Sequence, residues 1–402
     1  MRKPFPSSRS LCLNHITKLL MLLISLSCRS QDSKIFQINP KTFVENKITL
    51  TDIADDITYI PVDNSFPVSG IYQTSINFLK NSIYFSSKDI GVIRLNRDGT
   101  HPRVIGKKGR GPGEWQYCMS IAVDDRTETV YIMDSKNKIT MYYSNGNFKG
   151  TINLPVSEDG FDFSGVTFYN SNLFASQYIN MGHAKYNWII LDTLGKVITQ
   201  KFNSIPTFKG RIGGGGGTFK FNGKISYWNW FNDTVFTVLP DLSYRASYLF
   251  AKDKNRFPPG EIPFTSPSQF SELMNNYYIP IDMFETSRYL LYSYGFQKKA
   301  IIALIEKGSK QTFLTYLENN NGGIPNNLDG GLLFNPVHYF VENDREYLVS
   351  IIEPLSLKKH IAGDQFKNAN CRFPKKKDIL SALATKINET DNPIIMVVRL
   401  KK

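Results

Sequence analysis

Residues 105–115 read Ile-Gly-Lys-Lys-Gly-Arg-Gly-Pro-Gly-Glu-Trp, which is the most distinctive stretch of this chain. Its glycines allow the backbone to adopt positive φ repeatedly, and its proline fixes one φ at about −65°. This composition predicts an ordered, tight connection between two short β-like runs. Three cations lie on it, so the stretch could also contact a ligand. The motif residues are Gly106, Gly109, Arg110, Gly111, Pro112, Gly113 and Glu114, and the candidate ligand contacts within it are Lys107 and Lys108.

Short apolar strands joined by tight turns recur on both sides of this stretch. One unit spans 82–106 and has an Asp98-Gly99 turn, and the next spans 129–152 and has an Asn145-Gly146 turn. Both dipeptides are strong hairpin signals when alternating runs flank them. Further units follow at 172–198, 224–246, 288–304 and, with an interruption, 346–400.

Units of about 40–65 residues built from short strands are typical of β-propeller blades. A four-stranded sheet cannot bury both of its faces alone, so blades pack face to face around an axis until the ring closes. We therefore predict an all-β fold, a six-bladed β-propeller with four-stranded antiparallel blades, as a single domain over residues 50–402. Stretch 105–115 then connects two blades, with Trp115 as a packing anchor.

A few segments depart from the repeating strands. Residues 50–62 indicate a helical turn followed by a strand that stops near Pro61. Short helices are expected in the later units, at 268–274 and 377–384. Five consecutive glycines at 213–217 are not followed by Gly-Lys-Ser/Thr, so they predict a flexible loop between the third and fourth units instead of a phosphate loop.

The first 28 residues have the layout of a secretory signal, with a basic start, an apolar run at 19–26 and small residues at the end. The apolar run is far shorter than the ~20 residues that span a bilayer. Ser25-Leu26-Ser27-Cys28 resembles a bacterial lipobox, although Ser25 departs from its usual aliphatic residue. We predict lipidation at Cys28, with residues 29–49 as a tether and lead-in. The alternative is an ordinary signal peptide with an incidental cysteine.

The charge balance argues against a nucleic-acid partner. The chain has 48 Lys and Arg against 35 Asp and Glu, a formal net charge of +13. Removing residues 1–28, which hold four cations and no anion, leaves a net charge of about +9. That excess is dispersed and forms no basic face with interleaved aromatic residues. We therefore expect no nucleic-acid binding.

No set of residues identifies a reaction. The chain has no Gly-x-Ser-x-Gly elbow and no pair of histidines at metal-ligand spacing, so a metal site would need residues from several blades around the axis. No cofactor is predicted, although Ca²⁺ or Zn²⁺ at the axis stays open. The histidines after the signal segment are His101, His183, His338 and His360; the strand-end aspartates that read as turn formers or calcium ligands are Asp134, Asp192 and Asp233; and Cys118 and Cys371 read as unpaired.

Residues 227–231, Tyr-Trp-Asn-Trp-Phe, form the densest aromatic stretch. Packing within a blade would explain them. The functional alternative is a sugar-stacking platform on one face, with Trp228 and Trp230 as candidate ligand contacts.

Four stretches resemble the six-bladed β-propeller lipoproteins of Bacteroidota, a family loosely related to NHL-repeat propellers. The resemblance rests on Ile105-Gly106 with Gly-Arg-Gly-Pro-Gly-Glu at 109–114, on Tyr-Ile-Pro-Val at 59–62, on Asn-Asp-Thr-Val-Phe at 232–236 and on Asn-Pro-Ile-Ile-Met-Val-Val at 392–398. It covers nearly the whole chain after residue 28. It implies an exported propeller tethered by lipid to the cell envelope, at the outer membrane, and it supplies no catalytic residues.

A closed ring of blades offers a rigid funnel lined by loops, which is a common location for binding residues. The sequence therefore favours a lipid-anchored binding module for a peptide, protein or glycan over an enzyme. The alternative function is a metal-dependent lyase or hydrolase with its active site at the propeller axis.

Overall fold

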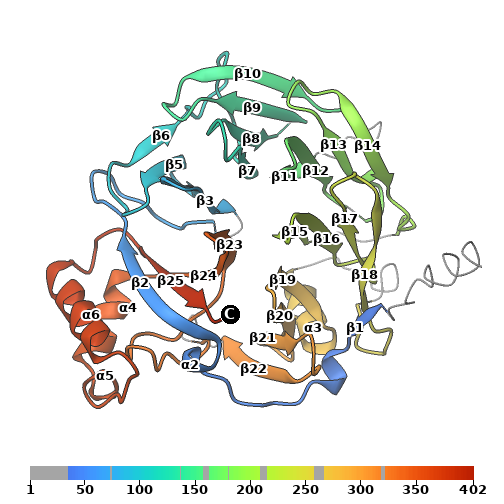
Figure 1. Ribbon diagram of the computed structural model, residues 1–402. Coiled ribbons are helices and arrows are strands. Elements are labelled where there is room, and N and C mark those ends of the chain that lie inside the picture. The colour runs from blue at the N-terminus through green and yellow to red at the C-terminus, as the bar shows by residue number, and fades with distance from the viewer. Residues whose placement is uncertain are drawn as a thin grey trace, which may run out of the picture. The chain divides into compact units, whose positions relative to one another are not determined.

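The computed structural model describes residues 35–72, 75–135, 137–156, 163–179, 181–208, 215–257, 267–317 and 322–402. Six antiparallel sheets stand around a central axis as the blades of a propeller (Figure 1). The predicted all-β, six-bladed fold is therefore confirmed. The predicted signal segment, including Cys28, lies outside the described residues.

Each blade contains four consecutive strands, except the last, which is completed from the N-terminal part of the chain. Blade one has β3 (Asn77–Phe78), β4 (Ser82–Ser87), β5 (Gly91–Asn96) and β6 (Arg103–Ile105). Blade two has β7 (Ser120–Val123), β8 (Val130–Asp134), β9 (Lys138–Tyr142) and β10 (Phe148–Asn153). Blade three has β11 (Phe163–Tyr169), β12 (Asn172–Gln177), β13 (Tyr186–Leu191) and β14 (Val197–Phe202).

The other blades follow the same order. Blade four has β15 (Gly216–Phe221), β16 (Lys224–Asn229), β17 (Thr234–Val238) and β18 (Tyr244–Phe250), and β1 (Phe36–Ile38) pairs with its outer edge. Blade five has β19 (Ile279–Glu285), β20 (Tyr289–Phe296), β21 (Lys299–Glu306) and β22 (Thr312–Leu317). Blade six has β23 (His338–Glu342), β24 (Arg345–Ile352), β25 (Ile394–Leu400) and β2 (Ala54–Pro61). The first strand of blades one to five, and β23 in blade six, lies nearest the axis (Figure 1).

The ring is closed by β2, which pairs with β25 from Ala54 opposite Leu400 to Pro61 opposite Ile394. Asp55 near its start accepts from Arg399 at 2.7 Å and from Arg345 at 2.6 Å. Since β2 precedes blade one in the chain and completes blade six in space, the closure joins the two ends of the propeller without a covalent bond.

The central strands of the blades are largely buried and mostly apolar because neighbouring sheets cover both of their faces. All six residues of β4 and of β13 are buried. One cluster joins blades one and two and includes Tyr84, Trp115 and Tyr142; another joins blades three and four around Trp188 and Tyr227. Blade-to-blade packing of this kind is what makes single strands read as continuous hydrophobic runs.

Helices occur at the N-terminal lead-in and in the later blades, as expected. The elements are η1 (Pro40–Thr42), α2 (Leu50–Ile53), α3 (Pro267–Asn276), α4 (Pro354–Ala362), α5 (Asp364–Lys367) and α6 (Pro374–Lys386). Leu357 of α4 and Leu380 of α6 are fully buried in the cluster of blades five and six. The predicted helices at 268–274 and 377–384 are confirmed as α3 and α6, whereas α4 and α5 were not predicted. Among the described residues, no helix is long and apolar enough to cross a membrane.

The glycine stretch 213–217 corrects one expectation. Residues 213 and 214 lie outside the described part, but Gly216 and Gly217 belong to β15 and pair with Asn229 and Trp228. A Cβ on Gly215 would lie 2.4 Å from the Trp230 ring, and one on Gly216 would lie 2.7 Å from the Trp228 carbonyl. The glycines therefore allow a strand to pass close to its neighbour, at least from 215 onward, and are not all loop.

Candidate functional site

The stretch 105–115 connects the outermost strand of blade one to the innermost strand of blade two, as predicted. Its backbone closes on itself, because the Gly109 N–H donates to the Trp115 carbonyl at 2.9 Å and the Trp115 N–H donates to the Lys107 carbonyl at 3.1 Å. The Glu114 carboxylate accepts from the Gly111 N–H at 2.8 Å and pairs with Lys107 at 3.0 Å. These two donors lower the pKa of Glu114.

Two of the motif glycines are required by their surroundings. Gly106 and Gly113 have φ of 73° and 72°, a conformation that L side chains rarely adopt. A Cβ on Gly106 would lie 2.5 Å from the Tyr142 ring, and the Tyr142 hydroxyl donates to the Gly113 carbonyl at 2.6 Å. The motif residues thus act as a structural connector. Ligand contact by Lys107 or Lys108 stays a prediction; both are exposed.

The predicted aromatic face is corrected by the burial of its residues. Trp228 is only 2% exposed, and it lies inside a blade where it cannot present a ring to a ligand. Trp230 is half-buried, and its indole N–H donates to the Pro280 carbonyl at 2.7 Å. The reason is that neighbouring blades cover both faces of a propeller sheet, so an aromatic strand in a blade packs against the next blade.

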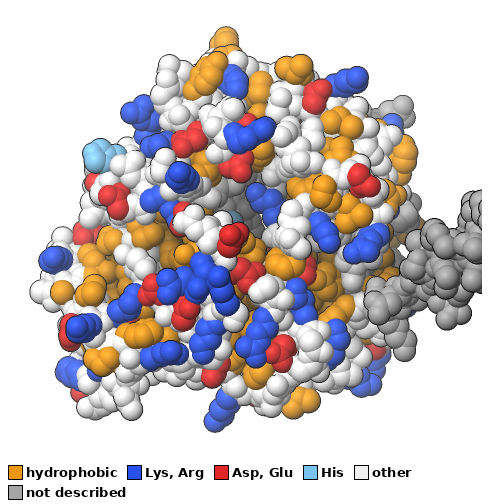
Figure 2. Space-filling view, viewed as in Figure 1, with side chains coloured by type: hydrophobic (Ala, Val, Ile, Leu, Met, Phe, Trp, Pro, Cys, Tyr) orange, Lys and Arg blue, Asp and Glu red, His pale blue; other side chains and the backbone are white. Residues whose placement is uncertain are grey.

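A hollow opens at the axis where the inner strands end and turn back into the second strands (Figure 2). We call it the axial funnel. Its volume is about 630 Å³, within the range of small-ligand sites. Five blades contribute its lining, which consists of residues 77–79, Val123, Asp125, Arg126, 168–171, 220–224 and 338–341.

Lys220 is a lysine of the axial funnel whose side-chain ammonium has no partner among the described residues. It lies near the end of β15, beside the buried Phe219, and solvent reaches it through the funnel. Its ammonium makes no hydrogen bond or ion pair with any residue that the structure describes. The surrounding protein lowers the pKa of Lys220, and the Asp125 carboxylate acts in the opposite direction. Lys220 is therefore a cation held near the axis without a partner.

His338, the first residue of β23, faces the same funnel. Its ring stacks on Phe78 of blade one at 6.0 Å between centroids, and Phe78 in turn stacks on Phe340 at 4.3 Å. Burial, together with the nearby Lys220 charge, lowers the pKa of His338 to about 3. The imidazole is consequently neutral at physiological pH and can accept as well as donate a hydrogen bond.

Most other charged groups near the funnel already have partners. Lys307 pairs with Glu285 at 3.0 Å, and Arg97 pairs with Glu342 at 3.1 Å. Arg126 donates to the Ser171 hydroxyl at 2.8 Å. Of the three cations that line the funnel, Arg126 is therefore bonded, whereas Lys220 and Lys224 have no hydrogen-bond or ion-pair partner among the described residues.

The described residues contain no group of three or more His, Cys, Asp or Glu side chains that could hold a metal ion. His360 bonds the Gly330 carbonyl at 2.8 Å and is not among the residues that line the funnel. Asp134 accepts from the Gln116 and Tyr117 N–H groups, Asp192 closes a turn, and Asp233 pairs with Arg256 at 3.0 Å. The three aspartates have structural partners, and Cys118 and Cys371 are free thiols, as predicted.

Asp282, on the innermost strand β19, is a further titratable residue with a shifted pKa. Burial raises the pKa of its carboxyl to about 7, and the Met283 N–H donates to it at 2.8 Å. It lies at a β-bulge between Pro280 and Asp282. It is not among the residues that line the axial funnel.

Neither Lys220 nor His338 was predicted from the sequence as a funnel residue, although His338 is one of the histidines considered as metal ligands. Both lie on innermost strands, and most of these strands were not predicted from the sequence. A usable signal was the single lysine within Thr-Phe-Lys-Phe, because strand alternation places its side chain on the face opposite the buried Phe219.

Comparison with known proteins gives a family and a fold. Residues 35–399 match the family described as a domain of unknown function, DUF4934. No curated protein matches the chain. A solved protein of Bacteroides fragilis, named as a candidate exported protein, is 20% identical with a TM-score of 0.66 over 92% of this chain and 100% of its own.

A second solved protein, a DUF4221 family member from Bacteroides vulgatus, is 10% identical with a TM-score of 0.45, over 87% of this chain and 98% of its own. At 20% identity, the likeness to the Bacteroides fragilis structure shows the fold alone. The family match is of a different kind, because it extends over almost all of the described residues. This chain is therefore a member of the DUF4934 family, with the fold of a six-bladed β-propeller.

Proposed function

We propose that this protein is an exported, lipid-anchored binding module of the cell envelope, and that its axial funnel holds a carboxylate group of a peptide, protein or glycan. The observation that carries the proposal is the unpartnered ammonium of Lys220 in a funnel lined by five blades. A carboxylate at this position would form a charge-assisted hydrogen bond, which is roughly twice as strong as a neutral one.

The funnel chemistry favours an anion over a neutral ligand or a cation. Its charged lining residues are Lys220, Lys224 and Arg126 against Asp125. The neutral His338 imidazole adds a hydrogen-bonding group without adding a charge. Aromatic rings of Phe78 and Phe221 supply apolar surface beside the cation. A carboxylate attached to an apolar or sugar body is complementary to this combination.

Export and anchoring are supported by the N-terminal layout. Residues 1–28 resemble a signal segment that ends in a lipobox-like Cys28, and the similar protein from Bacteroides fragilis is named as a candidate exported protein. Acyl chains contribute about 0.8 kcal/mol for each buried CH₂ group, so a multiply acylated cysteine would hold the chain stably at a membrane surface.

Lys220→Met tests the funnel, with Lys196→Met, an exposed turn lysine in blade three, as the matched control. Two acidic probes distinguish the sources of the carboxylate: a pentapeptide with a free C-terminus and trigalacturonate. Their neutral counterparts are the amidated peptide and the methyl ester.

We expect saturable NMR shifts with at least one acidic probe and much weaker shifts with its neutral counterpart. Lys220→Met should weaken binding at least about tenfold, because it removes a charge-assisted bond. Binding of neither acidic probe would contradict the proposal.

Cys28→Ala tests the anchor. The unaltered chain should incorporate labelled palmitate, and its processing should be blocked by globomycin, because lipoprotein maturation needs the cysteine thiol. The Cys28→Ala variant should lose both properties, whereas Cys12→Ala should keep them. Unchanged labelling of Cys28→Ala would rule out this anchor and leave the funnel proposal intact.

A further inference from the structure

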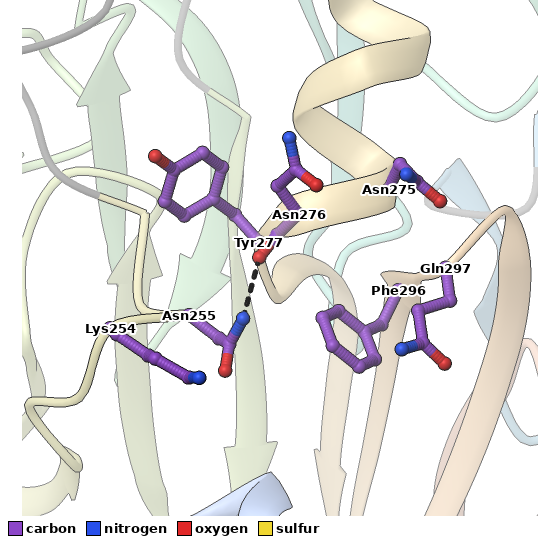
Figure 3. A pocket seen from close by; sticks show the side chains of 7 residues that line it. All are labelled: Lys254, Asn255, Asn275, Asn276, Tyr277, Phe296 and Gln297. Carbon is purple, nitrogen blue, oxygen red and sulfur yellow. Dashed lines mark hydrogen bonds between the residues drawn. The ribbon is translucent and has the colours of Figure 1, made fainter.

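A second pocket lies in blade five, at the opposite end of β19 from the axial funnel. Three chain segments meet there: residues 254–255 after β18, residues 275–277 between α3 and β19, and the turn at 296–297 between β20 and β21 (Figure 3). Its volume is about 500 Å³. We call it the amide pocket, because four carboxamide side chains line it: Asn255, Asn275, Asn276 and Gln297.

The amide pocket has an unusual lining chemistry. Besides the four carboxamides it contains Lys254 and the rings of Tyr277 and Phe296, and none of the described residues that line it is a carboxylate. A carboxamide both donates and accepts hydrogen bonds. The Asn275 and Gln297 carboxamides make no hydrogen bond with any described residue, so both can form hydrogen bonds with a ligand.

The walls are held in place by bonds made away from the opening. The Asn255 amide donates to the Asn276 carbonyl at 2.9 Å, as Figure 3 shows, and the Tyr278 N–H donates to the Asn255 carbonyl at 2.8 Å. Arg256, the next residue, is 9% exposed and bonds the carbonyls of Trp230 and Asn232. The segment after β18 is therefore anchored to blade four, and its amide is positioned before a ligand arrives.

The third wall is a two-residue hairpin turn. Gln297 and Lys298 have φ of 50° and 61°, the positive values of the tight turns that join twisted strands. The preceding Phe296 ring lies 4.4 Å from the Tyr278 ring, which fixes its orientation. Figure 3 shows the Phe296 ring and the Gln297 carboxamide side by side at this wall. The turn therefore places the apolar Phe296 ring and the Gln297 carboxamide next to each other at the amide pocket.

We propose that the amide pocket binds a neutral oligosaccharide. Neighbouring sugar hydroxyls both donate and accept, which matches a set of carboxamides, and the C–H face of a pyranose matches an aromatic ring. A cationic ligand would favour a lining with carboxylates, and the described lining residues include none. This site is independent of the axial funnel, since it lies at the start of β19 and uses different residues.

The test uses saturation-transfer NMR with maltotriose, cellotriose, mannotriose and chitotriose, and with trialanine as the peptide alternative. At least one sugar should give transfer, and its dissociation constant is then measured by calorimetry. The double variant Asn275→Ala/Gln297→Gly should weaken that binding at least about tenfold, because it removes two carboxamides. Glycine keeps the positive φ of residue 297 without strain.

Asn343→Gly is the matched control, since Asn343 also has positive φ, at 50°, in the β23–β24 turn, which lies outside the amide pocket. It should bind the sugar as the wild type does. The proposal is overturned if no sugar binds, if the double variant binds as well as wild type, or if trialanine binds more tightly than every sugar. Loss of sugar binding in the control variant would equally overturn the assignment to this pocket.

Discussion

Replacing Ile57 with aspartate should open the ring and lower the free energy of unfolding by about 3 kcal/mol or more. Ile57 is 2% exposed on β2, pairs with Val398 on β25 and belongs to the cluster that joins blades five and six. An aspartate at this position would bury a charge that has no partner. Because β2 supplies the outermost strand of blade six from the N-terminal part of the chain, the damage should extend to ring closure.

Thr58→Asp is the matched control, because Thr58 is the next residue of β2 and its side chain is exposed. Both variants add the same charge to the same strand, so only burial differs. The urea midpoint of unfolding, followed by tryptophan fluorescence, should fall strongly for Ile57→Asp and little for Thr58→Asp. Equal midpoints for the two variants would mean that β2 does not close the ring.

Replacing Trp115 with alanine should cost about 3–5 kcal/mol, the usual range for removing a buried aromatic side chain. Trp115 ends the glycine-rich connector, is 3% exposed and packs in the cluster between blades one and two. A Cβ on Gly91 would lie 2.3 Å from its ring, which shows how closely blade one packs against it. Alanine would leave a cavity between two blades that cannot easily collapse.

Trp115→Phe separates packing from hydrogen bonding. The Trp115 indole N–H has no hydrogen-bond partner among the described residues, so phenylalanine keeps an apolar ring and removes an unsatisfied donor. We expect Trp115→Phe to unfold near the wild-type midpoint, and Tyr117→Ala, at a 62% exposed position, to do the same. A wild-type midpoint for Trp115→Ala would show that the connector is not a packing anchor, and would favour its role as a ligand loop.

The second and third strands of most blades could be predicted from the sequence because they are largely buried and end at turn signals. β4 and β5, with the Asp98-Gly99 turn after them, are an example. The fourth strands are largely exposed, and they could be predicted because strong turn signals precede them. The innermost strands were mostly missed. β19 reads Ile-Pro-Ile-Asp-Met-Phe-Glu, in which a proline and polar residues obscure the alternation, since one face of the strand borders the axis.

The axial funnel could not be predicted for the same reason, because its residues lie on and next to the innermost strands. Lys220 in β15 looks like the solvent side of an ordinary strand, and only ring closure turns that side toward an enclosed funnel. The pairing of β2 with β25 could not be predicted for a different reason. β25 lies about 340 residues later in the chain, and local pattern carries no information on pairing over that distance. The connector 105–115 was interpretable because its glycines and proline constrain its own backbone.

The most direct test of the proposed function is the ratio of two dissociation constants for the acidic probe that binds, measured by calorimetry on the Lys220→Met variant and on the wild type. The funnel proposal predicts a ratio of at least about ten, with Lys196→Met close to one. The wild-type constant should also rise with added salt, because the attraction between charges is screened. A ratio near one for Lys220→Met would contradict the proposal that the partnerless lysine at the propeller axis holds the ligand.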